Sequence, residues 1–379
     1  MYNIFIVTAH TGYNYGTYLQ AYAMKKFMSK FADNVDIIWE KSLGPNGRDF
    51  RINKIVTIIF RTVINCRQLS NIGQGYSKNF KAAPSEKTKA LFDKFSKDYL
   101  KINELSNFQM RRIAYTNTTK AVITGSDQVW NASSMYPDPL YYLQFVPKLK
   151  RIAYAPSFGR ATIPNYNKKI IKKYLKSIPA ISVREEAGAQ IVKDLIGYEA
   201  PIVPDPTLIV DWTEWFAREK EDYLLLYFLD EPIEKVILDI KNIQMKTSLK
   251  IKVMLHAFDN YNEFEDFELL EGGPKEFVEM ISKARFVCTD SFHASIFSML
   301  SHTCFYTYER NYGKVDSQNS RLETLLEHYN LLNRLRKKPG EETLIIQYDM
   351  EHISQVRKED IRRAYKYMEW ALNNREALD

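Results

Sequence analysis

The sequence predicts an α/β fold built from two Rossmann-like domains. Short runs of apolar and β-branched residues alternate with stretches that carry apolar residues at helical spacing. This alternation stops at the proline-rich residues 202–208 and starts again near residue 223. The length of 379 residues also suits two domains of ~150 residues or more each.

We therefore expect three parts. Residues 1–210 should form an N-terminal Rossmann-like domain with a helical insertion at about 44–105. Residues 211–355 should form a second Rossmann-like domain, and residues 356–379 a helix that docks back on the first.

Composition is that of an ordinary soluble globular protein, with 45% hydrophobic and 26% charged residues. The three cysteines, Cys66, Cys288 and Cys304, lie far apart without metal-ligand spacing, so we expect a reducing compartment and no metal site. No apolar run reaches the ~18 residues that a spanning helix needs, and residues 1–6 enter a strand pattern without a signal peptide. We expect a cytoplasmic protein. The net charge of +7 fits anionic small ligands or an anionic membrane surface as well as it fits nucleic acid.

The first strand is expected at residues 3–8, followed by a polar loop that contains Asn14 and Gly16 and by a helix over residues 19–24. The glycine spacing does not match the dinucleotide fingerprint, so no dinucleotide site is expected. Two interpretations remain for the loop. Its amides and the helix N-terminus hold an anion, or it is an ordinary turn.

Residues 44–105 interrupt this rhythm with an amphipathic segment. The apolar face consists of Ile52, Ile55, Val56, Ile59, Phe60 and Val63. Arg51, Lys54 and Arg61 fall on the opposite side. Such a helix either lies on a membrane surface or covers a core.

The central motif begins with a buried strand over residues 121–124. Gly125 ends the strand, and Ser126, Asp127, Gln128 and Trp130 follow. Because ligands of parallel α/β sheets sit at the carboxyl ends of the strands, this stretch is a candidate site. The alternative is a capped turn with Trp130 packed in the core.

Two later strands also end on candidate residues. Arg184 directly follows a strand at 180–183, either as an anion-binding cation or as half of a structural ion pair. A strand at 285–289 runs into Asp290, Ser291 and His293, which places the histidine near the positive end of the next helix or in a purely structural role. After a last strand at 304–308, the chain offers further cations at Arg310, Lys314 and Arg321.

Four motifs in this order resemble the polysaccharide pyruvyl transferase family over about residues 3–330. They are 14–16 (Asn-Tyr-Gly) with 19–23 (Leu-Gln-Ala-Tyr-Ala), 125–131 (Gly-Ser-Asp-Gln-Val-Trp-Asn), 204–207 (Pro-Asp-Pro-Thr) and 289–298 (Thr-Asp-Ser-Phe-His-Ala-Ser-Ile-Phe-Ser). The resemblance implies two Rossmann-like domains that face each other across a cleft, as in GT-B glycosyltransferases. It also implies transfer of the pyruvate unit of phosphoenolpyruvate to a sugar as a ketal, with loss of phosphate. The acceptor is a sugar or a lipid-linked oligosaccharide. Phosphoenolpyruvate is a co-substrate, and neither a cofactor nor nucleic acid is implied.

The reaction that the resemblance implies needs an acid, a base and cations, which the chain can supply at the ends of its strands. His293 and Asp127 are the catalytic candidates, with His293 as acid or phosphate contact and Asp127 at the sugar hydroxyls, or the reverse. The substrate-binding candidates are Asn14, Gly16, Ser126, Gln128, Trp130, Arg184, Asp290, Ser291, Arg310, Lys314 and Arg321. Some members carry Arg where this chain has Ser291, so the anion must be held elsewhere, by Arg184, Arg310, Lys314 or Arg321.

Two other functions compete with this one. A glycosyltransferase could use a nucleotide sugar on the same architecture. A non-catalytic sugar-binding protein of polysaccharide assembly is the third interpretation, and the presence of both Asp127 and His293 argues against it.

Overall fold

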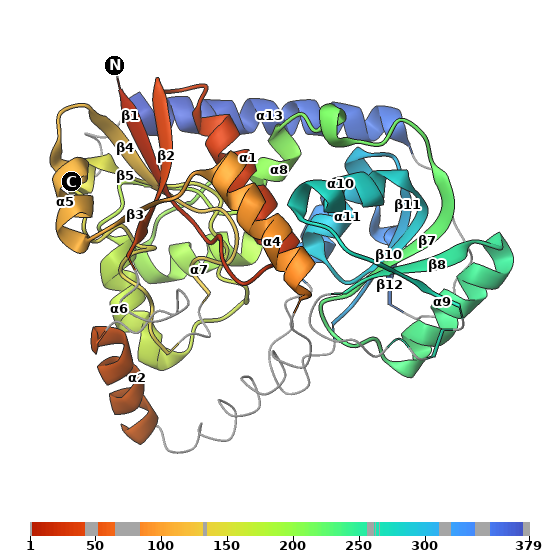
Figure 1. Ribbon diagram of the computed structural model, residues 1–379. Helices are drawn as coiled ribbons and strands as arrows, with labels where there is room; N and C mark the ends of the chain where they lie inside the picture. The colour runs from red at the N-terminus through yellow and green to blue at the C-terminus, as the bar shows by residue number, and fades with distance from the viewer. Residues whose placement is uncertain are drawn as a thin grey trace.

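The structure is a computed structural model of the chain. It describes residues 2–41, 52–64, 84–131, 135–255, 261, 263–264, 266–310, 320–337 and 349–373, with only the backbone of 53, 61–64 and 320. Two α/β domains lie side by side, and the long helix α13 (Met350–Asn373) runs along both of them at the top of the view in Figure 1.

The N-terminal domain is built on a six-stranded parallel sheet with the order β3-β2-β1-β4-β5-β6. Its strands are β1 (Asn3–Val7), β2 (Asn34–Glu40), β3 (Asn103–Leu105), β4 (Thr119–Thr124), β5 (Arg151–Ala153) and β6 (Ala180–Ile181). Its helices include α1 (Tyr15–Met28), α5 (Asn107–Tyr115), α6 (Asn165–Leu175) and α7 (Glu186–Ile196). The central strands β1 and β4 are mostly apolar and almost entirely buried, as expected for a parallel sheet that is covered on both faces.

The C-terminal domain repeats this topology. Its parallel sheet has the order β12-β11-β10-β7-β8-β9, which is the same winding traced from the other edge. Its strands are β7 (Glu221–Tyr227), β8 (Lys250–Met254), β9 (Glu268–Leu270), β10 (Ala284–Thr289), β11 (Cys304–Tyr308) and β12 (Leu335–Arg336). Its helices are α9 (Glu234–Thr247), α10 (Pro274–Lys283), α11 (Phe292–Leu300) and α12 (Ser320–His328). Two sheets of this kind confirm the predicted fold class.

In both sheets the order in which strands are added reverses in the middle, between β1 and β4 in the first sheet and between β7 and β10 in the second. In doubly wound sheets the crevice beyond the carboxyl ends of the strands at such a point is where ligands bind. Asp127 lies in the loop after β4, and His293 lies in the first turn of α11, which follows β10, so both catalytic candidates lie at the expected kind of position.

Several elements differ from the sequence expectation. The insertion at 44–105 contains α2 (Ile52–Ile64), α4 (Glu86–Phe95) and a π-helical turn (Ser96–Leu100), but its end is the edge strand β3. The strands β3, β9 and β12 were not expected, because three or fewer residues carry no readable period. The helix α5 was not expected either. Residues 202–208 were expected to be neither helix nor strand, yet α8 (Pro206–Ile209) begins there, since proline is tolerated at the first helical position.

The two domains pack directly on one another. The ring of Tyr15 in α1 stacks on that of Phe277 in α10 at 4.5 Å between centroids, and its hydroxyl donates to the Gly272 carbonyl at 3.0 Å. In α13, Arg357 donates from Nε and Nη2 to carbonyls near the end of α8, and the Tyr367 hydroxyl donates to the Ala153 carbonyl at 2.8 Å. The terminal helix begins at Met350, earlier than the expected residue 356, and residues 374–379 lie outside the described residues.

Candidate active site

The loop after β4 is shaped by its glycine. Gly125 has φ of +112°, and a Cβ there would lie 2.0 Å from the Tyr154 carbonyl oxygen, so no other residue fits without a shift. The Ser126 hydroxyl then lies 3.1 Å from the Ala155 carbonyl and 3.1 Å from Oδ2 of Asp205. Asp127 follows with φ of +61°. This left-handed conformation is unfavourable for residues other than glycine, and residues that adopt it are concentrated at functional sites.

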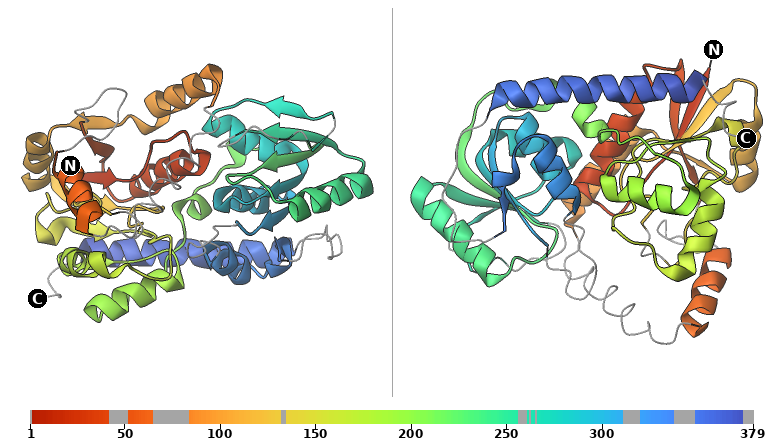
Figure 2. Two further views of the ribbon diagram at one scale, coloured as in Figure 1. Left: turned by 90° about the horizontal axis from the view of Figure 1, so that it is seen from below. Right: turned by 180° about the vertical axis from the view of Figure 1, so that it is seen from behind.

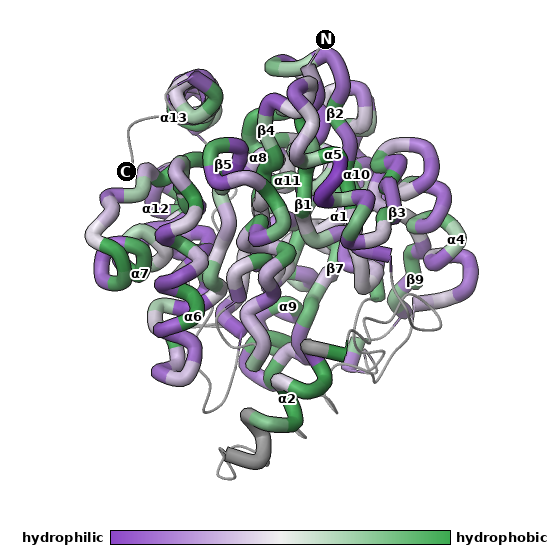
Figure 3. The backbone as a smooth tube through the Cα atoms, turned by 90° about the vertical axis from the view of Figure 1, so that its left-hand side faces the viewer, coloured by the Kyte–Doolittle hydropathy of each residue, from purple (hydrophilic) through white to green (hydrophobic). Residues whose placement is uncertain are grey.

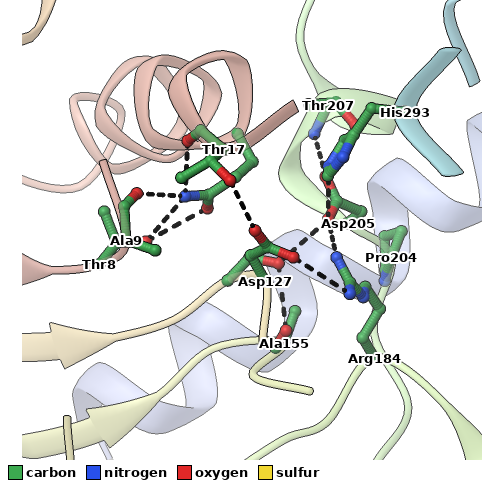
Figure 4. Close-up of polar contacts among 12 residues, drawn as sticks. Thr8, Ala9, Thr17, Asp127, Ala155, Arg184, Pro204, Asp205, Thr207 and His293 are labelled. Atoms are coloured by element: carbon green, nitrogen blue, oxygen red, sulfur yellow. Dashed lines mark hydrogen bonds and ion pairs between the residues drawn. The ribbon is translucent and has the colours of Figure 1, made fainter. Parts of the chain in front are cut away.

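Asp205 is the centre of the polar cluster (Figure 4). Its Oδ1 accepts from the Thr207 amide at 3.0 Å and from the Thr207 hydroxyl at 2.7 Å. Its Oδ2 accepts from Arg184 Nη1 at 2.7 Å, and His293 Nε2 lies 3.6 Å away. Burial alone would raise the pKa of Asp205, but His293, Arg184 and the Thr207 amide outweigh it and hold the pKa far below its usual range. Asp205 is therefore ionised at neutral pH.

His293 reaches this cluster from the other domain. It is the second residue of α11, whose N-cap Ser291 accepts from the Ala294 amide at 3.3 Å. Its ring packs on the first turn of α1, where a Cβ at Gly16 would lie 2.1 Å from His293 Nδ1. Glycine at position 16 is thus required for the imidazole to fit. The N-termini of α1 and α11 meet at this contact, and a helix N-terminus favours anions.

Asp127 and Arg184 connect the cluster to α1. The Thr17 hydroxyl donates to Asp127 Oδ2 at 3.2 Å, and Arg184 Nη2 lies 3.5 Å from Asp127 Oδ1 (Figure 4). Burial alone would raise the pKa of Asp127, but the charges of Arg184, His293 and Arg321 hold it below its usual value. Asp127 is ionised at neutral pH and close to both helix N-termini.

A second arginine lies beside the first. The guanidinium carbons of Arg184 and Arg321 lie 4.6 Å and 5.9 Å from the ring centre of Phe292. Burial, together with the charge of Arg184, lowers the pKa of Arg321 to about 10. A buried cation in this position gains when an anion binds nearby.

Hydrogen bonding in the cluster is incomplete. Within the described part of the chain, Arg184 Nε and Nη2, both carboxylate oxygens of Glu185 and His293 Nε2 are buried without a hydrogen-bond partner. Arg184 Nε lies 3.6 Å from Glu185 Oε2, which is an ion-pair distance but too long for a hydrogen bond. Because most buried polar groups are hydrogen-bonded, such a concentration of unsatisfied atoms marks a place prepared for a ligand.

Two other predicted residues, Asp290 and Arg310, form a separate contact where the strand order of the second sheet reverses. The Asp290 carboxylate accepts from the amides of Leu229 and Asp230 at 2.7 Å and 2.9 Å. Arg310 Nε lies 3.1 Å from Asp290 Oδ2 and also donates to the Asp290 carbonyl. Burial raises the pKa of Asp290 despite the charge of Arg310. Arg310 is thus already held by a carboxylate, and Lys314 lies outside the described residues.

The remaining predicted residues have local roles. Asn14 is the N-cap of α1 and accepts from the Thr17 amide at 3.2 Å, while Gln128 accepts from Asn131 Nδ2 at 3.1 Å. Trp130 was predicted to bind substrate, but it is only 1% exposed and packs in the core. Its ring stacks on Tyr142, and its Nε1 donates to the Tyr141 carbonyl. A large aromatic residue after a buried strand packs in the core more readily than it contacts a ligand.

Sequence reasoning missed four members of the cluster as site residues: Thr17, Glu185, Asp205 and Phe292. Asp205 belongs to the Pro-Asp-Pro-Thr motif at 204–207, which in the sequence indicates only the family resemblance and the break between the two domains. Its position between two prolines, ahead of a threonine that it can cap, was the available signal. Nothing local marks Thr17, because its partner is 110 residues away.

The described residues contain neither a membrane-spanning helix nor a cluster of metal ligands. None of the described helices is both long and apolar enough to cross a bilayer. No group of three or more His, Cys, Asp or Glu side chains in these residues could hold a metal ion.

Comparison with known proteins gives one family and several distant structures. The family model described as polysaccharide pyruvyl transferase matches residues 14–312. No curated protein matches the sequence.

Three solved structures illustrate the structural similarity. UDP-N-acetylglucosamine 2-epimerase from Rickettsia bellii is 8% identical with a TM-score of 0.46, covering 100% of this chain and 99% of that one. UDP-GlcNAc 2-epimerase from Neisseria meningitidis, bound to UDP-GlcNAc, is 9% identical with a TM-score of 0.43, covering 98% and 94%. E. coli heptosyltransferase WaaC with ADP is 11% identical with a TM-score of 0.37, covering 84% and 89%.

Proposed function

The chain belongs to the polysaccharide pyruvyl transferase family, and from this membership we propose that it transfers the pyruvate unit of phosphoenolpyruvate to a sugar as a ketal. The observation that supports the proposal best is the buried cluster at the domain junction. It brings His293 of one domain to within 3.6 Å of Asp205 and adjoins Asp127 and Arg184 of the other domain. This combination offers an imidazole, an ionised carboxylate and a cation at one place.

The donor carries a carboxylate and a phosphate, so its site needs positive charge. Arg184 and Arg321 are buried cations near the ring of Phe292. The first turns of α1 and α11 add the positive potential of two helix N-termini. Arg184 Nε and Nη2 make ion pairs but no hydrogen bond, so they can donate hydrogen bonds to the oxygens of phosphoenolpyruvate. Arg321, whose pKa is lowered to about 10 by burial and by Arg184, regains stability when an anion binds. Among the four candidate cations, these two fit the donor best.

The transfer needs one acid and one base. The methylene of phosphoenolpyruvate takes a proton, the first sugar hydroxyl adds to the resulting electrophilic carbon, and its proton goes to a base. The bond from carbon to the phosphate oxygen then breaks, phosphate leaves, and the second hydroxyl closes the ketal ring while its proton departs with phosphate or solvent. We assign His293 to the proton of the methylene or to the phosphate, and Asp127 to the sugar hydroxyls.

Asp205 acts through His293 in this scheme. Its negative charge faces Nε2, which favours the proton on that nitrogen and leaves Nδ1, beside Gly16, to face the first turn of α1. Asp205 is therefore a positioning residue, and Asp127 and His293 are the catalytic residues.

The acceptor in this proposal is a sugar of a polysaccharide or of its lipid-linked precursor. A lipid-linked acceptor would bring the protein to the inner face of a membrane. The reaction needs no further cofactor, because phosphoenolpyruvate supplies the transferred group.

Calorimetry with phosphoenolpyruvate tests the donor, and detection of released phosphate together with a new ketal carbon signal in the acceptor tests the transfer. Binding that weakens in an Arg321→Gln variant and is unchanged in an Arg362→Gln variant is the expected result. No heat with phosphoenolpyruvate, with or without acceptor, would count against the proposal.

The two competing functions have different signatures in a thermal-shift screen. A nucleotide-sugar glycosyltransferase would be stabilised by nucleotide sugars and be indifferent to phosphoenolpyruvate. A non-catalytic sugar-binding protein would respond to the acceptor alone.

A further inference from the structure

Helix α2 exposes its apolar face instead of burying it. The exposed fractions are 72% for Ile52, 38% for Ile55, 58% for Val56, 58% for Ile59 and 64% for Phe60. No other described helix or strand carries more than two large apolar side chains that are exposed. Burial of the face against the core, one of the two interpretations of the sequence, is therefore contradicted for these residues.

The rotation of the helix explains the exposure. Lys54, Thr57 and Ile58 lie on the inner side and are half-buried, so the helix turns its less apolar side toward the protein. Figure 3 shows α2 at the periphery in the colour of hydrophobic residues. Arg51 lies outside the described residues, as do the side chains of Arg61 and Val63, so the face is defined here by Ile52, Ile55, Val56, Ile59 and Phe60.

A strongly basic helix lies at the same end of the N-terminal domain (Figures 1 and 2). Helix α6 contains no acidic residue. Its exposed lysines, with the one that follows it, are Lys168, Lys169, Lys172, Lys173 and Lys176. An apolar face alone would suit many partners. An apolar face on α2 beside the lysines of α6 is complementary to an apolar layer covered by anionic groups.

We propose that α2 and α6 form a membrane-binding surface, in which the apolar face of α2 enters the lipid layer and the lysines of α6 contact anionic headgroups. A helix of 13 residues is about 20 Å long, and lying in the interface it can bury this face to a depth of ~5–10 Å. Apolar burial and charge attraction together provide the two signals that stable attachment requires. The inference goes beyond the transfer reaction and is independent of it.

Co-sedimentation of the full chain with vesicles tests the surface, without donor or acceptor present. Vesicles of equimolar phosphatidylcholine and phosphatidylglycerol should bind the protein, and vesicles of phosphatidylcholine alone should bind it weakly. An Ile55→Ser, Ile59→Ser, Phe60→Ser variant should lose binding by roughly tenfold or more for each side chain removed. Because these side chains are exposed, the variant should keep its thermal stability.

Lysine variants separate the two contributions. Replacing Lys168, Lys169, Lys172 and Lys173 by Gln should reduce binding to anionic vesicles by up to roughly fivefold for each charge, and leave weak binding to neutral vesicles unchanged. Helix α9 supplies the matched controls, since Leu238 and Met245 are exposed apolar residues and Lys235 and Lys246 are exposed lysines. Leu238→Ser with Met245→Ser, and Lys235→Gln with Lys246→Gln, should bind like the parent protein.

Three results would overturn the proposal. The parent protein fails to sediment with anionic vesicles at low salt, or the α2 serine variant sediments as well as the parent. In the third, light scattering finds that the parent protein is a dimer and the α2 serine variant a monomer, and neither binds vesicles. The apolar face of α2 would then be the interface with a second copy of the chain. A protein that binds vesicles but transfers no pyruvate would retain this inference and refute the proposed reaction.

Discussion

Arg336 and Asp239 in the C-terminal domain form a buried arginine–aspartate pair, as do Arg184 and Asp205 at the domain junction, yet their surroundings differ. Arg336 donates from Nε and Nη2 to the two oxygens of Asp239, each at 3.0 Å. The Tyr308 hydroxyl donates to the same carboxylate at 2.9 Å, and the guanidinium lies 4.1 Å from the ring centre of Tyr306. Every group in this pair has a partner of good geometry.

Arg184 is less completely satisfied. It makes one short hydrogen bond, to Asp205 at 2.7 Å, and two longer ion pairs, to Asp127 at 3.5 Å and to Glu185 at 3.6 Å. Two of its nitrogens and both oxygens of Glu185 are buried without a hydrogen bond among the described residues.

The difference separates a structural ion pair from a functional one. A fully bonded buried pair has no capacity left for a ligand, and its removal leaves an isolated charge in the interior. A partly bonded pair costs stability in the free protein, and a ligand can recover that cost by completing the hydrogen bonds. Variants of the Arg336–Asp239 pair should therefore change stability and spare ligand binding. Variants of the cluster around Arg184 and Asp205 should change ligand binding or turnover.

The largest effect should follow from breaking the structural pair. Replacing Arg336 by Met leaves Asp239 buried without its partner, and we expect the free energy of unfolding to fall by about 3–5 kcal/mol in urea denaturation. Arg362→Met is the control, because Arg362 and Glu359 form an exposed pair at 3.8 Å that should contribute under about 1 kcal/mol. A loss as small as that of the control, or weakened phosphoenolpyruvate binding by folded Arg336→Met protein, would contradict the distinction.

The next effect concerns turnover at the functional cluster. His293→Ala should fold normally, because the side chain it removes leaves no charge without a partner, and should reduce turnover by a factor on the order of 10² or more. His293→Gln should be nearly as inactive if proton transfer is the role of the imidazole, and much more active if the residue only contacts phosphate. A His293→Ala protein that transfers pyruvate at the parental rate would return His293 to a structural role.

A smaller effect is expected when lysine replaces Arg184, because this keeps the positive charge but removes the planar guanidinium group. Lysine cannot hold Asp205 and Asp127 and also contact the donor, so Arg184→Lys should weaken phosphoenolpyruvate binding roughly tenfold in calorimetry. Raising the salt concentration should change this affinity only modestly, since screening over a Debye length of about 8 Å acts mainly on exposed charges. Parental affinity in Arg184→Lys, or a steep salt dependence, would place the donor at exposed cations instead.

The sequence predicted what depends on short-range pattern. The strands that precede Gly125, Arg184 and Asp290 were located from apolar runs, and sites form beyond the carboxyl ends of parallel strands. The centre of the cluster was not found this way, because Asp205 acquires its meaning from Ser126 and His293, which lie 79 and 88 residues away in the chain. Likewise, the period of α2 identifies an apolar face but cannot say whether that face turns inward or outward.

The smallest effect is a change in acid stability that reports on Asp205. Its pKa is depressed in the folded protein, so the stability it contributes is fully present above its unfolded pKa of about 3.9 and is lost as the pH falls below that value toward the folded pKa. Asp205→Asn cannot titrate, so the free energy of unfolding should fall less between about pH 6 and pH 3 in this variant than in the parent, whatever its stability at neutral pH. Urea denaturation at a series of pH values measures both slopes. Equal slopes would mean that Asp205 has an ordinary pKa, and the argument that its charge orients His293 would then fail.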